Sequence, residues 1–146
     1  MEWQPKTVAV GVDGSKTSFK AAEIAAEMAR TWKAKLLIVS VVRTPEGWWG
    51  IGGAPPSPEA LSAALVEGQE QVLREVEEGL ALDGIDYETI QELGDPSSKI
   101  IDVIEDRIVD LIVIGRRGAG LAERIMLGSV ADQLCHTSPV PVMVVP

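Results

Sequence analysis

The apolar positions of this chain form short, nearly continuous runs that alternate with segments in which apolar residues recur at the helical period. Such runs predict the strands of a sheet whose two faces are both covered, and the periodic segments predict the helices that cover it. The strands are predicted over Lys6 to Val12, Lys35 to Val42, Asp86 to Gln91, Leu111 to Ile114 and Pro141 to Val145. We expect Lys35 to Val42 at the centre of the sheet and the more polar Asp86 to Gln91 at an edge.

Helices are predicted over Ser18 to Thr31, over Leu61 to Leu80, from Asp95 onward, and over Ser129 to His136. Asp95-Pro96 matches an N-cap residue followed by proline at the first helical position. We expect this third helix to face the core with Ile100, Ile101, Ile104 and Ile108. The segment from Arg43 to Pro58 is rich in glycine and proline, contains Trp48 and Trp49, and is predicted to be a long loop.

The alternation of strands and helices predicts an α/β fold. The simplest arrangement is a doubly wound, five-stranded parallel sheet of order 3-2-1-4-5, Rossmann-like or flavodoxin-like, in a three-layer α/β/α sandwich. We see no internal repeat, and we expect residues 1–146 to form a single domain. The ligand crevice of such a sheet lies beyond the carboxyl ends of the first and fourth strands, which here lead into Asp13 and Gly115.

Composition restricts the partners that we expect. A net charge of −9 disfavours attachment to nucleic acid or to an anionic membrane surface. No apolar run approaches the roughly 18 residues of a membrane span, and the first residues carry no leader-like apolar segment, so we expect a soluble, cytoplasmic protein. The single cysteine, Cys135, excludes an intramolecular disulfide, and we expect its thiol to be buried as a small apolar group.

The most informative motif is a glycine pattern at the end of the fourth strand. Two residues separate Gly115 from Gly118, and nine more precede Gly128 and Ser129 at the head of the last helix. Glycines allow close approach of the backbone to a ligand, and a helix N-terminus offers free N–H groups to anions. The motif lacks the lysine of a Walker A loop, and no segment of the chain has the third glycine of a dinucleotide fingerprint. It predicts a polyphosphate-binding site.

This spacing, together with Asp13 after the first strand, resembles the universal stress protein family in its nucleotide-binding branch. The resemblance extends from the first strand, at Val8, to the last, at Val145. It implies that the protein binds ATP and acts in the stress response. It also implies a magnesium or manganese ion between Asp13 and phosphate oxygens, although Asp13 alone could instead cap the first helix.

The resemblance also implies a role for each position of the site. The positions implied around adenine and ribose are Gly11, Val12, Asp13 and Val41, and those implied along the phosphates are Gly115, Arg117, Gly118, Gly128, Ser129 and Val130. Ala131 replaces a hydroxyl residue that is frequent in similar proteins; the loss is expected to weaken triphosphate binding by about 1.5 to 3 kcal/mol, so AMP and ADP remain alternative ligands. Arg116 and Arg117 are each a candidate phosphate contact or a solvated charge, and the resemblance favours Arg117.

No catalytic residue is predicted, because no nucleophile has a base beside it and the lone histidine, His136, is far along its helix from the expected phosphates. Two alternatives to the binding function remain open. One is a slow ATPase that phosphorylates itself at Ser129, and the other is a nucleotide-free interaction module. We expect a homodimer through Pro141 to Val145, because an apolar edge strand needs a cover, and the resemblance implies the same pairing.

Overall fold

The computed structural model describes residues 2–43, 57–117 and 127–146. The described strands are β1 (Thr7–Gly11), β2 (Lys35–Val42), β3 (Tyr87–Leu93), β4 (Leu111–Gly115) and β5 (Val142–Val145). They form one parallel sheet of order β3-β2-β1-β4-β5, which confirms the predicted order and the edge position of β3. The predicted loop that contains Trp48 and Trp49, and the position of Gly118, lie outside the described residues.

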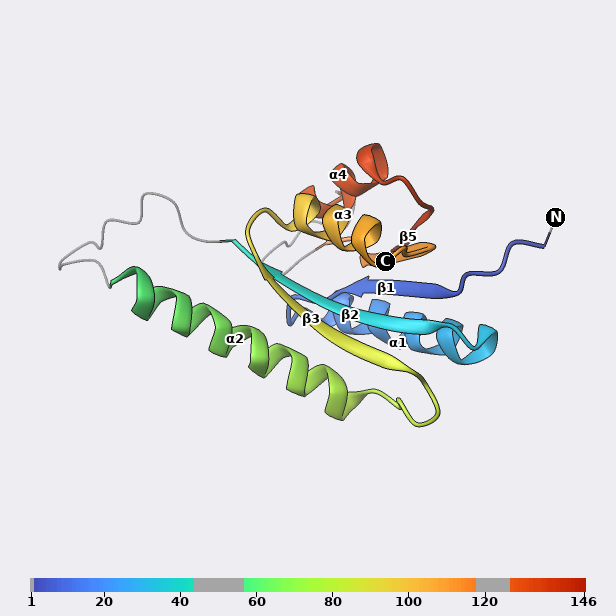
Figure 1. Ribbon diagram of the computed structural model, residues 1–146, viewed down its shortest axis with the longest axis horizontal. Helices are drawn as coiled ribbons and strands as arrows, with labels where there is room; N and C mark the ends of the chain where they lie inside the picture. The colour runs from blue at the N-terminus through green and yellow to red at the C-terminus, as the bar shows by residue number, and fades with distance from the viewer. Residues whose placement is uncertain (1, 44–56, 118–126) are drawn as a thin grey trace.

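Helices cover both faces of this sheet. They are α1 (Lys16–Trp32), α2 (Pro58–Gly79), α3 (Pro96–Asp106) and α4 (Ser129–Thr137). Figure 1 shows α1 and α2 on one side of the strands and α3 and α4 on the other. The fold is therefore the predicted doubly wound α/β sandwich. No helix in the described part of the chain combines the length and the apolar character that crossing a bilayer requires.

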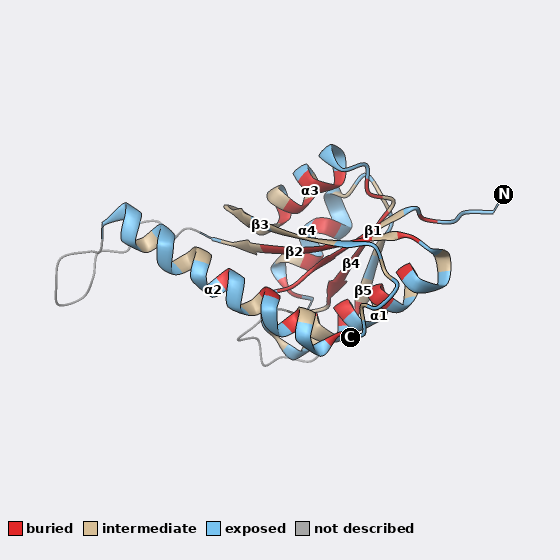
Figure 2. Ribbon diagram, turned by 60° about the horizontal axis from the view of Figure 1, so that its bottom comes forward, coloured by how far each residue is buried: buried red, intermediate tan, exposed pale blue. Residues whose placement is uncertain are grey.

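The strand β2 is apolar at consecutive positions because each of its faces meets a helical layer. Leu36 and Ile38 pack in the core cluster of α1 and α2, whereas Leu37 and Val39 pack in that of α3 and α4. Figure 2 shows buried residues concentrated on the central strands and on the inner faces of the helices. The pattern of near-continuous burial is the one expected for a parallel sheet enclosed on both sides.

Two predictions about individual side chains are wrong. Ile108 is 79% exposed, because α3 ends at Asp106 and the backbone of Ile108 has a φ of 52°, in the left-handed region. This reversal brings Val109, which is 3% exposed, into the core instead. Cys135 is also exposed, since the buried side of the short helix α4 is formed by Ala131 and Leu134.

Candidate functional site

A cavity of about 340 Å³ opens at the carboxyl edge of the sheet, where the strand order reverses beside β1. Its walls come from the ends of β1, β2 and β4 and from the starts of α1, α3 and α4. The volume lies within the range of small-ligand sites, at the position where doubly wound sheets bind their ligands. The predicted site positions that line it are Gly11, Val12, Asp13, Val41, Gly115, Arg117, Gly128, Ser129 and Val130.

The turn after β1 is fixed by local hydrogen bonds. The Asp13 carboxylate accepts a hydrogen bond from the Ser15 backbone N–H, with an N–O distance of 2.9 Å, and Gly14 supplies the positive φ of 86° that this turn requires. The cap of α1 is Ser15, whose hydroxyl oxygen accepts from the Ser18 N–H at 3.1 Å. The alternative role of Asp13 as the helix cap is therefore wrong, and its exposed side chain lies at the cavity.

At the end beside β2, the cavity is lined by apolar side chains and by backbone groups that can form hydrogen bonds. The last hydrogen bond between β1 and β2 runs from the Val12 N–H to the Val39 carbonyl oxygen, at 2.8 Å. Val41 lies two residues further along, so its N–H and C=O point to the same side as those of Val39, where β1 has ended. Pro96 and Ile100 add apolar surface here. This combination suits a flat heterocycle that is read by backbone hydrogen bonds.

The opposite end is the N-terminus of α4. Its N-cap residue is Gly128, which provides no side-chain cap, whereas the caps of α1, α2 and α3 are side chains of Ser15, Ser57 and Asp95. The first intrahelical hydrogen bond runs from the Asp132 N–H to the Gly128 carbonyl, at 2.9 Å. The N–H groups that precede Asp132 thus have no partner inside the helix, and together with the helix dipole they favour an anion.

Gly115 has a packing role that the glycine motif did not reveal. A Cβ atom at this position would lie 2.9 Å from Thr17 Cγ2, 3.2 Å from the Thr17 carbonyl carbon and 3.3 Å from the Ser18 backbone nitrogen. Two of these atoms belong to the backbone of the first turn of α1 and have little room to move. Glycine at this position therefore lets α1 lie close to the end of β4, beside the cavity.

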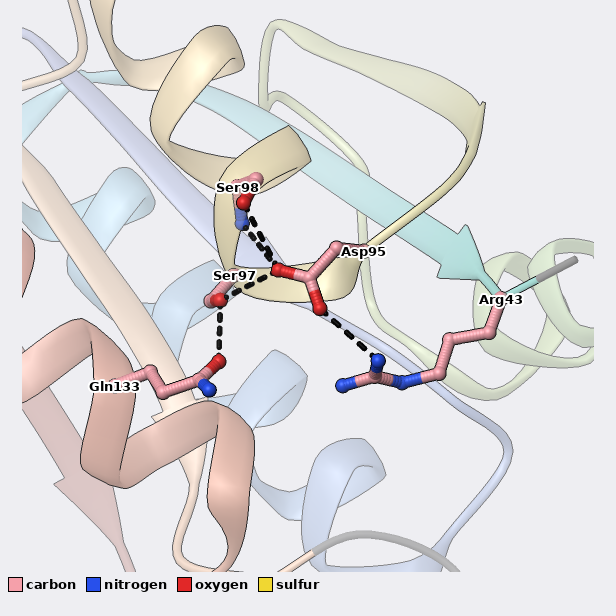
Figure 3. A network of polar contacts seen from close by, with 5 residues as sticks. All are labelled: Arg43, Asp95, Ser97, Ser98 and Gln133. Carbon is pink, nitrogen blue, oxygen red and sulfur yellow. Dashed lines mark hydrogen bonds and ion pairs between the residues drawn. The ribbon is translucent and has the colours of Figure 1, made fainter. Parts of the chain in front are cut away.

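A polar network connects the walls of the cavity (Figure 3). The Asp95 carboxylate caps α3 by accepting from the Ser98 N–H at 3.2 Å, and it pairs with the Arg43 guanidinium at 3.0 Å just after β2. Ser97 Oγ lies 2.9 Å from the Asp95 carboxylate and also contacts the side-chain amide of Gln133 on α4. The network links the start of α3 to the exit of β2 and to α4, so it holds both ends of the cavity in place.

These contacts favour the ionised form of Asp95. Hydrogen bonds from Ser97, then from the hydroxyl and the backbone of Ser98, and the charge of Arg43 hold the pKa of this carboxyl below its usual value. The group is therefore a carboxylate near neutral pH, where it accepts all of these hydrogen bonds.

The site contains several residues that the sequence alone did not indicate. They are Ser18, Val39, Pro96, Ile100 and Ile114, which line the cavity. The alternation along β2 could have indicated Val39, because it shares a face with Val41. Arg116 was a candidate phosphate contact on the sequence, where the resemblance favoured Arg117, and Ala131 was named as a departure from similar proteins; all three line the cavity.

In a comparison with known protein families, residues 5–146 match the model of the universal stress protein family. A universal stress protein of Synechocystis sp. is 34% identical over 142 residues, which cover 97% of this chain and 85% of the relative. Among solved structures, a universal stress protein in complex with cAMP has a TM-score of 0.63 and 26% identity, covering 99% of this chain and 98% of its own. The universal stress protein from Archaeoglobus fulgidus in complex with dAMP has a TM-score of 0.62 and 22% identity over 100% of both chains.

The network at Asp95 predicts a pH dependence of stability. Asp95→Asn keeps a capping oxygen but removes the charge, so at pH 7 we expect the free energy of unfolding to fall by no more than about 1 kcal/mol, because Asp95 and Arg43 are both partly solvated. The folded-state pKa is lowered, so the carboxylate contributes stability above the pKa of the unfolded chain, and this contribution is lost as the pH falls through the folded-state pKa.

Urea unfolding of the wild type and of Asp95→Asn at a series of pH values measures this difference. We expect it to shrink as the pH falls below about 4. The control is Asp102→Asn, at an exposed position of the same helix. A difference that stays constant down to acid pH would contradict the assigned role of the charge.

Proposed function

The chain belongs to the universal stress protein family, and from this premise we propose that it binds an adenine nucleotide, ATP, and acts through it in the stress response. The proposal rests on one observation, which is that the two ends of the cavity suit different parts of a nucleotide. One end has an apolar wall with the backbone groups of Val41, and the other has the uncapped N-terminus of α4. A nucleotide has the matching order of a flat base, a sugar and an anionic tail.

The structures of relatives support this choice of ligand. One similar universal stress protein was solved with cAMP and another with dAMP, and both ligands contain adenine and a phosphate. Because these ligands carry a single phosphate, AMP and ADP remain alternatives to ATP, and the missing hydroxyl at Ala131 favours them relative to ATP.

The proposed pose follows from the layout of the cavity. Adenine lies against Val41, with Gly11 and Val12 in the adjoining wall. Ribose and the first phosphate follow past Asp13, Gly115 and Arg117, and Gly118 belongs to the same motif. The terminal phosphates reach the N–H groups at the start of α4, at Gly128, Ser129 and Val130.

A divalent ion fits this pose at Asp13. The described residues contain no group of three or more histidine, cysteine, aspartate or glutamate side chains that could hold a metal by themselves. Magnesium is commonly held by one or two carboxylates together with phosphate oxygens and water, so Asp13 alone suits a metal that arrives with the nucleotide. Manganese has the same preference for oxygen ligands.

We propose a binding function rather than catalysis. Of the described residues that line the cavity, Asp13 is the sole carboxylate and none is a histidine. Rapid hydrolysis needs a base that activates water or a hydroxyl, so at most slow ATP hydrolysis or phosphorylation of Ser129 is expected. With a net charge of −9, the expected partners are the nucleotide and a second copy of the chain, in the cytoplasm, rather than nucleic acid or a membrane.

The cradle at α4 can be tested with Ser129→Pro. Proline suits this first helical position, as Pro58 and Pro96 show at the starts of α2 and α3, and the extended backbone of Gly128 (φ −64°, ψ 157°) suits a residue before proline. The change removes the N–H and the hydroxyl of Ser129 while preserving the helix. We expect ATP affinity to fall about 10- to 100-fold or more, and adenosine affinity to stay unchanged.

Isothermal titration calorimetry of the wild type, Ser129→Pro and Ser129→Ala with ATP, AMP and adenosine measures these effects. Ser129→Ala, which keeps the N–H, should lose less ATP affinity than Ser129→Pro. If the wild type binds none of the three compounds, the proposed function is wrong. Equal ATP affinity in all three proteins would place the phosphates elsewhere.

We also propose a homodimer through the edge strand β5. Met143 is 36% exposed on this strand, and nearby Trp3 is 49% exposed beside Trp32, with 6.1 Å between the ring centroids. These side chains, together with Met28, line an apolar hollow at the β5 edge of the sheet. An unpaired, apolar edge is a surface that a second copy can cover.

Sedimentation equilibrium at micromolar concentration tests the dimer. We expect about twice the chain mass of 15.6 kDa for the wild type and a shift toward one chain mass for Met143→Asp, which places a charge in the interface. Ile108→Asp, at an apolar residue that is 79% exposed after α3, is the matched control and should remain dimeric. A wild type that sediments with the mass of one chain would contradict the proposal.

A further inference from the structure

The backbone of Arg116 is held at the junction of β4, β5 and α4. Its N–H donates to the Val145 carbonyl, and its own carbonyl accepts from the Gly128 N–H, each over 2.7 Å. The second of these bonds ties Arg116 directly to the N-cap residue of α4. Arg116 also lines the cavity, so it stands beside the end at which the proposed nucleotide carries its phosphates.

The guanidinium of Arg116 has an unsatisfied donor. Among the described residues, the buried side-chain nitrogen and oxygen atoms without a hydrogen-bond partner are Gln69 Oε1 and Arg116 Nε. The Gln69 amide is neutral, and its nitrogen already donates to the Ser40 and Glu92 carbonyls at 3.0 and 2.8 Å. Arg116 differs because its side chain carries a cationic guanidinium and the residue lines the cavity. A buried cationic N–H without an acceptor is costly, and it calls for an anion.

We propose that Arg116 Nε donates to a phosphate oxygen of the bound nucleotide and so serves as a specificity residue for the phosphorylated ligand. This inference rests on the proposed function. The planar guanidinium fork matches phosphate oxygens, and the positive end of α4 adds to the same field. Ala131, which is 2% exposed in the same cavity, has no side-chain donor, whereas Arg116 has one.

If Arg116 is present for the phosphate, its buried Nε–H opposes folding when no ligand is bound. Arg116→Gln should therefore leave the Tm of the nucleotide-free protein unchanged or higher, while it weakens phosphate binding. A residue that merely supports the fold would show a lower Tm and an equal loss for every ligand.

Calorimetric titrations with ATP, AMP and adenosine, and thermal unfolding without ligand, test this inference on the full chain. Arg116→Gln should bind ATP and AMP about 10- to 100-fold more weakly and adenosine as the wild type does. Arg116→Lys keeps the charge without the fork and should lose part of that affinity. Arg74→Gln, on the exposed side of α2, makes the same change of charge away from the cavity and should bind like the wild type.

The outcomes separate the two claims. A wild type that binds ATP, with Arg116→Gln of equal affinity, overturns the role of Arg116 and leaves the proposed function standing. Equal losses for ATP and adenosine, or a lower Tm of the empty variant, also overturn it. A wild type that binds no adenine compound overturns both claims.

Discussion

The cavity depends on the hydrogen bonds that hold β1 between β2 and β4. Val8 to Val10 pair with β2 on one side and with β4 on the other, and beyond Gly11 the strand ends. β2 continues to Val42, so part of its backbone has no neighbour on the β1 side. α1 covers one face of the sheet and α4 the other, so the segments that follow β1 and β4 run to opposite faces. They leave an opening between them at the edge of the sheet. The described residues that line the cavity surround this break in the sheet.

Within the opening, the local charge is positive, although the net charge of the protein is negative. The net charge of −9 repels anions at long range, but the uncapped start of α4, Arg116 and Arg117 gather positive groups at one end of the cavity. Each of the other helices has a side-chain cap that accepts from one of its first N–H groups, whereas α4 has no such cap, and in the proposed function a phosphate takes its place.

The fold was predictable because burial on both faces makes the strands continuous apolar runs, as in β2, and because local caps such as Asp95-Pro96 depend on adjacent residues. The motif positions were predictable for a similar reason, since they follow strand ends and a helix start. The exposure of Ile108 was not predictable, because helical periodicity does not indicate at which residue a helix ends. The packing role of Gly115 against α1, and the contact of Ser97 with Gln133, 36 residues away, depend on tertiary geometry that no local pattern encodes.

The central claim is that the free N–H groups at the start of α4 receive the phosphates. The amide resonances of Ser129, Val130 and Ala131 in a ¹⁵N–¹H spectrum, followed during titration with ATP and separately with adenosine, test it most directly. ATP should shift these resonances strongly, and adenosine should shift the resonance of Val41 while leaving them nearly in place. Binding of ATP with shifts confined to other parts of the chain would contradict the account.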